Sequence, residues 1–96
     1  LKMYRGSHRN GHLPVFSEKG RYLDPERYPI SQATAIPANR GDVVYFHYLA
    51  IHGSDINTTK KVRKSVLVQV RDPSDINIDG QHNGSHGQGM MLAGTT

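Results

Sequence analysis

Two residues that could do chemistry, His52 and Arg63, lie at equal distances from the midpoint between Asn57 and Thr58. In an antiparallel hairpin that turns at this midpoint, they stand directly opposite each other on one face, with Cβ atoms roughly 5 Å apart. An imidazole and a guanidinium do not attract each other, so this arrangement predicts a further group between them. An anion chelated to a metal ion would suit that position.

Two apolar segments are expected to form the strands that position this pair. Residues 43–49 are largely apolar on both alternating faces, which is typical of a strand covered on both sides. Residues 62–71 alternate between a face of four valines and Lys64 and a more polar face that includes Arg63. We expect the valine face to pack against other residues and the polar face to line a cavity. His52 and Ser54 would share that polar face.

The first part of the chain predicts short elements joined by loops. Residues 1–8 resemble the end of a strand that runs into a glycine turn, and 34–36 could form another short strand. Glycines and prolines interrupt residues 9–28, which we interpret as a loop lying over a site. Within it, Asp24 followed by proline favours a short helical turn over 24–28.

The size and composition of the chain allow at most one small domain. A chain of 96 residues buries only about 60–65% of its unfolded surface. The hydrophobic fraction is 35%, tryptophan is absent and there are 10 glycines, which is little material for an independent core. We therefore expect a fragment of a longer protein, with a domain portion over residues 1–73 and a glycine-rich loop or tail over 74–96.

The net charge and the placement of aromatic residues indicate which class of molecule the chain would bind. The formal charge is +4, and residues 1–40 carry all of this excess. A basic half suits an anionic substrate or a nucleic acid, although a solvated basic loop is the simpler interpretation. A nucleic-acid binder would also interleave aromatic stacking residues with its basic ones, and this chain does not. We predict a small-molecule substrate and no nucleic acid as partner.

Cysteine and membrane signals are both absent from the sequence. Without cysteine, no disulfide and no thiolate metal site can form, which fits a reducing compartment, and we predict a cytoplasmic location. No apolar run approaches the ~18–20 residues needed to span a bilayer, so no membrane partner is expected.

Several of these residues, in this order, resemble the C-terminal part of the phytanoyl-CoA dioxygenase family. In that family a Gly-Asp strand leads to an iron-binding histidine, an Asn-containing turn follows, and an arginine stands eleven positions after the histidine. Gly41-Asp42, His52, Asn57 and Arg63 have that order and spacing. The segment Gly6-Ser7-His8-Arg9 resembles the family's Pro-Gly-Ser-His segment, with Arg5 in place of the proline before the glycine.

The resemblance implies an Fe(II)- and 2-oxoglutarate-dependent oxygenase that uses O2. His52 would be the distal iron ligand and Arg63 would hold the far carboxylate of 2-oxoglutarate, a task for which a bidentate guanidinium suits better than an ammonium. A nearby hydroxyl, that of Ser54 or Ser65, could complete the cosubstrate pocket, and Ser54 matches a family position more clearly. Iron in this class takes two histidines and one carboxylate.

The chain departs from the family pattern at the first two ligands. These come as His-x-Asp or His-x-Glu, and none of the six histidines here is followed by an acid two residues later. In the family that motif precedes the Gly-Ser-His segment, so it would lie before Leu1. We predict that the fragment alone is inactive, because one imidazole does not hold Fe(II) with useful affinity.

The remaining histidines are interpreted as structural. His47 is expected to be a packed, hydrogen-bonded core residue, and His8 to tie the Gly-Ser-His turn to its surroundings. His82 and His86 have the spacing of a metal pair but no third ligand nearby. The basic residues early in the chain are expected to be surface charges.

The sequence thus predicts an all-β fragment, the C-terminal half of a double-stranded β-helix of the jelly-roll or cupin-like type. The predicted function is that of a dioxygenase that hydroxylates a small organic or acyl substrate. A non-catalytic cupin-like binding module that keeps the Arg63 pocket is the alternative. An unpaired valine face also predicts either homo-oligomerisation or a missing N-terminal segment that completes the barrel.

Overall fold

The computed structural model describes residues 1–18, 20–76, 87 and 90–93 of the chain. Two compact units are distinguished, Leu1–Lys61 and Val62–Thr96, and each is described by itself. The first unit contains all the strands and helical turns assigned in the described residues.

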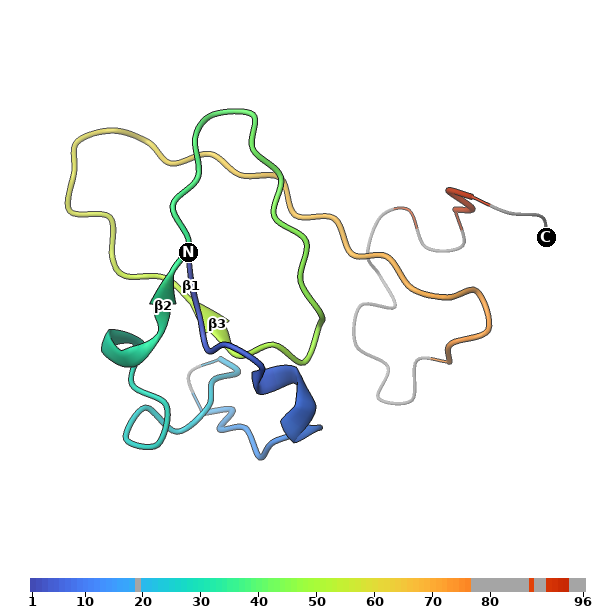
Figure 1. Cartoon of the computed structure of the whole chain (residues 1–96), viewed down its shortest axis with the longest axis horizontal. Helices are drawn as coiled ribbons and strands as arrows, with labels where there is room; N and C mark the ends of the chain where they lie inside the picture. The colour runs from blue at the N-terminus through green and yellow to red at the C-terminus, as the bar shows by residue number, and fades with distance from the viewer. Residues whose placement is uncertain (19, 77–86, 88–89, 94–96) are drawn as a thin grey trace. The chain divides into compact units, whose positions relative to one another are not determined.

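A three-stranded antiparallel sheet organises the first unit (Figure 1). Strand β1 (Lys2–Met3) lies in the middle, between β2 (Thr34–Ala35) and β3 (His52–Gly53). Met3 pairs with Thr34 on one side and with His52 on the other. The sheet therefore brings together three segments that are distant in sequence, and the candidate ligand His52 lies on an edge strand.

Backbone hydrogen bonds extend this small sheet beyond its assigned strands. The Ile36 amide donates to the Leu1 carbonyl at 2.9 Å, and the Tyr4 amide donates to the Ile51 carbonyl at 2.9 Å. A salt bridge of 2.8 Å between Lys2 Nζ and Asp55 Oδ2 joins β1 to the residues after β3. The predicted short strand at 34–36 and the strand end within 1–8 are confirmed.

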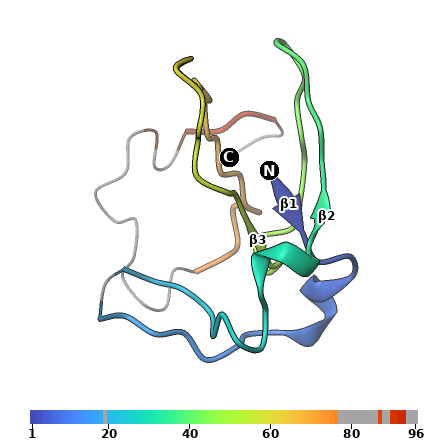
Figure 2. The same ribbon diagram turned by 90° about the vertical axis from the view of Figure 1, so that its left-hand side faces the viewer.

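Two 3-10 turns flank the sheet. The first, η1 (Ser7–Asn10), follows Gly6, whose φ of 73° lies in the left-handed region that glycine adopts without steric cost. The second, η2 (Ile30–Gln32), runs beside β3 (Figure 2). A Cβ on Gly53 would lie 3.0 Å from Ile30 Cδ1, so the absence of a side chain there permits this close packing.

The loop between η1 and η2 has local order of its own. Phe16 and Tyr22 exchange two backbone hydrogen bonds of 2.8 and 3.1 Å, and their rings lie 5.6 Å apart. The predicted turn at Asp24 is present, because the Tyr28 amide donates to the Asp24 carbonyl at 2.9 Å. The Asp24 carboxylate also accepts a hydrogen bond from the Glu26 amide at 2.9 Å, as expected of an N-terminal cap.

The predicted strands at 43–49 and 62–71 are wrong. Neither segment has strand structure, and most of their apolar side chains are exposed, with Tyr45 90% and Val66 91% accessible. The predicted packing of the valine face is therefore also wrong. Alternation of residue types specifies which side chains share a face, but a strand forms only when a neighbouring strand pairs its backbone groups.

The predicted hairpin turn centred on Asn57 and Thr58 lies further along the chain. The bend covers residues 59–61, where Asn57 Nδ2 of the side chain donates to the Lys61 carbonyl at 2.7 Å and the Thr59 hydroxyl donates to Asn57 Oδ1. Asn57 thus shapes the turn as predicted, but through side-chain hydrogen bonds and without flanking strands. The symmetry argument that set His52 opposite Arg63 does not apply to this turn.

The described residues contain little buried material. Among them, Ala33 is the buried hydrophobic residue and Ser7 the buried polar one, at 8% and 6% exposure. An antiparallel sheet with little helix is consistent with the predicted all-β class. The division into residues 1–73 and 74–96 stays a prediction, and most of the predicted tail lies outside the described residues.

No helical segment among the described residues is long and apolar enough to cross a membrane. The predicted cytoplasmic location stays a prediction.

Tyr4 is expected to contribute measurably to the stability of the first unit. Its hydroxyl donates a 2.6 Å hydrogen bond to the Pro29 carbonyl, and its ring packs edge-on against Tyr28 at 5.8 Å. Tyr4→Phe keeps the ring contact and removes the hydrogen bond, so it should lower the free energy of unfolding by about 1 kcal/mol. Urea unfolding measures this, with Tyr45→Phe, a site 90% exposed, as the matched control. Equal midpoints for the two variants would contradict the prediction.

A turn at Asp72 should respond to acid. The Ser74 hydroxyl and amide both donate to the Asp72 carboxylate, and these hydrogen bonds lower its pKa below the ordinary value. The turn is therefore favoured while Asp72 is ionised, and this contribution is lost as pH falls through the lowered pKa. Carboxyl chemical shifts followed through an acid titration should give a low pKa for Asp72. Ser74→Ala should raise that pKa toward the ordinary value.

Candidate functional site

The imidazole of His52 is oriented by its own backbone. His52 Nδ1 lies 2.8 Å from the Ala50 carbonyl oxygen. A carbonyl oxygen can only accept, so in the neutral imidazole Nδ1 carries the proton and Nε2 has the lone pair. The side chain is exposed, which leaves Nε2 open to a ligand. A histidine whose second nitrogen is bonded to a backbone carbonyl is the usual arrangement of a metal ligand.

The backbone before His52 is fixed on both sides by the segment that follows β1. The Ile51 amide donates to Ser7 Oγ at 2.8 Å, and the Ile51 carbonyl accepts from the Tyr4 amide at 2.9 Å. Upstream, the Ala50 amide donates to the His47 carbonyl at 2.9 Å and closes a turn. The position of His52 therefore depends on residues 4–7, far away in sequence.

Two residues of the Gly-Ser-His segment tie it to the stretch before β3. His8 was predicted to tie the turn to its surroundings, and its ring lies 5.5 Å from the ring of the distant His47, although the side chain is exposed. The buried Ser7 also makes a long-range hydrogen bond, to the Ile51 amide, which was not predicted. The signal that could have revealed this is the small hydroxyl residue between Gly6 and His8, since Ser can accept a backbone N–H at close quarters. The Tyr4 contact had no sequence signal.

The aromatic surroundings of His52 come from the segment before it. The Phe46 ring lies 4.8 Å from the His52 ring at 56°. His47 was predicted to be a packed core residue and is exposed instead. It is hydrogen-bonded as expected, because its Nδ1 accepts from the Leu49 amide at 3.1 Å, and its ring stacks on Tyr48 at 4.8 Å. Since the predicted strand is absent, no second layer among the described residues covers His47, whose ring contacts that of His8 at 5.5 Å.

The other three predicted site residues are all exposed, one in the first unit and two in the second. Ser54 follows β3 directly, in the same unit as His52. Arg63 and Ser65 lie in the second unit, in a segment without regular secondary structure. The predicted approach of Arg63 to His52, and with it the shared cosubstrate pocket, stays a prediction.

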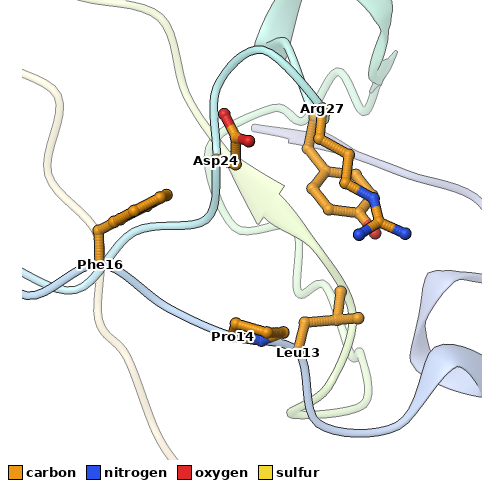
Figure 3. Close-up of a pocket in the computed structure, with 6 residues that line it drawn as sticks. Leu13, Pro14, Phe16, Asp24 and Arg27 are labelled. Carbon is orange, nitrogen blue, oxygen red and sulfur yellow. The ribbon is translucent and has the colours of Figure 1, made fainter.

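A hollow of about 140 Å³ lies in the first unit between the loop of residues 13–16 and the Asp24 turn (Figure 3). Apolar side chains from the loop line one side, and Asp24, Arg27 and Tyr28 line the other. The Arg27 guanidinium lies 5.5 Å from the centre of the Tyr28 ring. Tyr28 contacts Tyr4, which in turn bonds to Ile51, so the wall of the hollow is connected to β3.

The described residues contain no group of three or more histidines and acids arranged to hold a metal ion. His82 and His86, which have the spacing of a metal pair, lie outside the described part. Within that part, His52 is the imidazole whose Nδ1 is bonded to a backbone carbonyl, which leaves Nε2 for a metal. Its donor chemistry fits Fe(II), which accepts imidazole ligands.

Comparison with known proteins supports the family that the motifs indicated. The family model described as phytanoyl-CoA dioxygenase (PhyH) matches residues 1–65 of the 96-residue chain. Neither the curated proteins nor the solved structures yield a match. The matched range includes the Gly-Ser-His segment, His52 and Arg63. The chain therefore belongs to the phytanoyl-CoA dioxygenase family.

Proposed function

We propose that this chain is the C-terminal half of the catalytic domain of an Fe(II)- and 2-oxoglutarate-dependent dioxygenase that hydroxylates a small organic or acyl substrate. Members of the family generally depend on Fe(II) and 2-oxoglutarate. The observation that carries the proposal is the 2.8 Å contact of His52 Nδ1 with the Ala50 carbonyl, which leaves Nε2 free in a residue at the family's ligand position. The domain would be a double-stranded β-helix, of which this chain supplies part.

Each proposed site residue has a defined task. His52 would bind iron through Nε2, and the Phe46 ring beside it would restrict the imidazole to one orientation. Arg63 would form a bidentate ion pair with the distal carboxylate of 2-oxoglutarate. The hydroxyl of Ser54 or Ser65 would donate a hydrogen bond to the same carboxylate. Bound Fe(II) supplies the O2 chemistry that oxidises 2-oxoglutarate and hydroxylates a C–H bond. The protein's part is to hold the cosubstrate and substrate in a fixed orientation.

The remaining iron ligands would come from outside this chain. The family's His-x-Asp or His-x-Glu motif does not occur at any of the six histidines. We propose that a segment preceding Leu1 supplies it and pairs with the residues whose apolar side chains are exposed here. The chain alone would then bind iron through a single imidazole and have no activity.

The test compares the chain alone with the polypeptide encoded by its complete reading frame. The complete polypeptide should convert 2-oxoglutarate to succinate and CO2 with consumption of O2, and this should require added Fe(II). The chain alone should neither convert 2-oxoglutarate nor consume O2, with or without added Fe(II). A complete reading frame without a His-x-Asp or His-x-Glu ahead of Leu1, and without 2-oxoglutarate turnover, would reject the proposal.

A second candidate function is that of a non-catalytic small-molecule binding module. The hollow beside the Asp24 turn favours it, because apolar side chains together with the Arg27 guanidinium and the Asp24 carboxylate suit a small organic molecule with polar groups. A binder of this kind would retain its affinity for 2-oxoglutarate or a related anion after metal removal. Calorimetric titration of the complete polypeptide with and without a chelator separates the two functions.

The isolated chain is expected to self-associate. Val66, Val68 and Leu67 are 70–91% exposed in one continuous segment, and exposed apolar segments of this kind drive association. Val66→Lys combined with Val68→Lys should reduce the association, as measured by sedimentation velocity over a range of concentrations. Ser31→Lys combined with Gln32→Lys adds the same charge at two exposed polar residues and serves as control. A monodisperse wild-type monomer would count against a missing covering segment or partner copy.

A further inference from the structure

The peptide group between Ala50 and Ile51 connects Ser7 to His52. Its N–H belongs to Ile51 and donates to Ser7 Oγ at 2.8 Å. Its carbonyl belongs to Ala50 and accepts from His52 Nδ1 at 2.8 Å. Because a peptide group is planar, the direction of its N–H fixes the direction of its carbonyl. Two side chains that are distant in sequence are therefore joined through one rigid plane.

We propose that Ser7 is a positioning residue, which holds this peptide plane so that the Ala50 carbonyl keeps His52 in the Nδ1–H tautomer with Nε2 directed to its ligand. Ser7 is 6% exposed, so water does not compete freely for its hydroxyl. A hydrogen bond to the N–H of a peptide also polarises its carbonyl, which strengthens the bond from His52. Ser7 acts through the peptide and does not touch the metal or the cosubstrate.

The surrounding contacts make Ser7 the adjustable part of this connection. The Ile51 carbonyl is held separately by the Tyr4 amide at 2.9 Å, and this main-chain bond does not depend on the Ser7 side chain. The Ser7 amide bonds to the Tyr4 carbonyl at 3.2 Å, which sets its backbone in place. Removing only the Ser7 hydroxyl therefore releases the 50–51 peptide plane, while the backbone bond between Tyr4 and Ile51 remains.

The first test measures the tautomer of His52 in the metal-free chain. Imidazole 15N shifts at a pH above the histidine titration should show His52 mainly as Nδ1–H in the wild type. Ser7→Ala should shift the population toward Nε2–H, and Ser7→Thr, which keeps the hydroxyl, should restore the wild-type spectrum. Ser31→Ala, at an exposed serine, is the control and should change nothing. A wild-type His52 in the Nε2–H form would overturn the proposal even if Ser7→Ala did not fold.

The second test uses metal affinity and rests on the proposed function. In the complete polypeptide, Ser7→Ala should weaken Fe(II) binding by about 10–100-fold, the usual effect of losing an outer partner of a ligand. Ser7→Thr should rescue it. A tautomer shift in a polypeptide that binds no iron in any form would reject the iron function and leave the positioning role intact. An unchanged tautomer in a folded Ser7→Ala variant would reject the positioning role itself.

Discussion

Replacing His52 with alanine in the complete polypeptide should abolish Fe(II) binding and 2-oxoglutarate turnover. The proposed iron site has three protein ligands, and this variant would remove one of them. Loss of an outer partner alone costs about 10–100-fold in metal affinity, so loss of a direct ligand should exceed about 100-fold. Turnover of 2-oxoglutarate without substrate should fall to background with it.

The matched control for this variant is His47→Ala. His47 belongs to the same stretch, is also exposed and also makes a local hydrogen bond through Nδ1. Its Nδ1 accepts from the Leu49 amide, so a neutral His47 carries its proton on Nε2, the opposite of His52. Iron binding should therefore survive in His47→Ala. Normal 2-oxoglutarate turnover by His52→Ala would reject the assignment of His52 as a ligand.

Local features of the chain could be predicted because their causes are local. Asp24 followed by proline specifies a capped turn whichever residues surround it, and the structure has that turn. Gly6 marks the turn after β1, since its positive φ suits glycine. The family membership also followed from the order and spacing of a few residues in 1–65. None of these inferences needs knowledge of what packs against the segment.

The strands at 43–49 and 62–71 could not be predicted correctly for the opposite reason. Their alternating apolar residues describe what a strand would bury, and burial requires a partner strand that the described residues do not supply. The same limit applies to His47, whose predicted burial assumed a layer above it. The link from Ser7 to His52 depends on a turn that brings residue 7 to residue 51, and no local pattern reveals such a contact.

Arg63→Ala should mainly raise the requirement for 2-oxoglutarate. A charge-assisted hydrogen bond to a carboxylate contributes about 1.5–3 kcal/mol. At about 1.36 kcal/mol for each factor of ten, the KM for 2-oxoglutarate should rise about 10–150-fold. The kcat at saturating cosubstrate should change much less, because the distal carboxylate is remote from the reacting atoms. Arg63→Lys should be intermediate, since a lysine keeps the charge but loses the bidentate geometry.

Arg71→Ala provides the comparison for this effect. Arg71 lies in the same unit and donates through Nη1 to the Asp75 carbonyl, so its guanidinium already has a structural task. Its removal should leave the KM for 2-oxoglutarate unchanged, whereas added ethylguanidinium should partly restore affinity to Arg63→Ala alone. This rescue distinguishes a lost carboxylate partner from a general loss of folding, because a small cation cannot repair an unfolded unit. An unaltered KM in Arg63→Ala would show that another cation binds the distal carboxylate. It would not affect the prediction for His52.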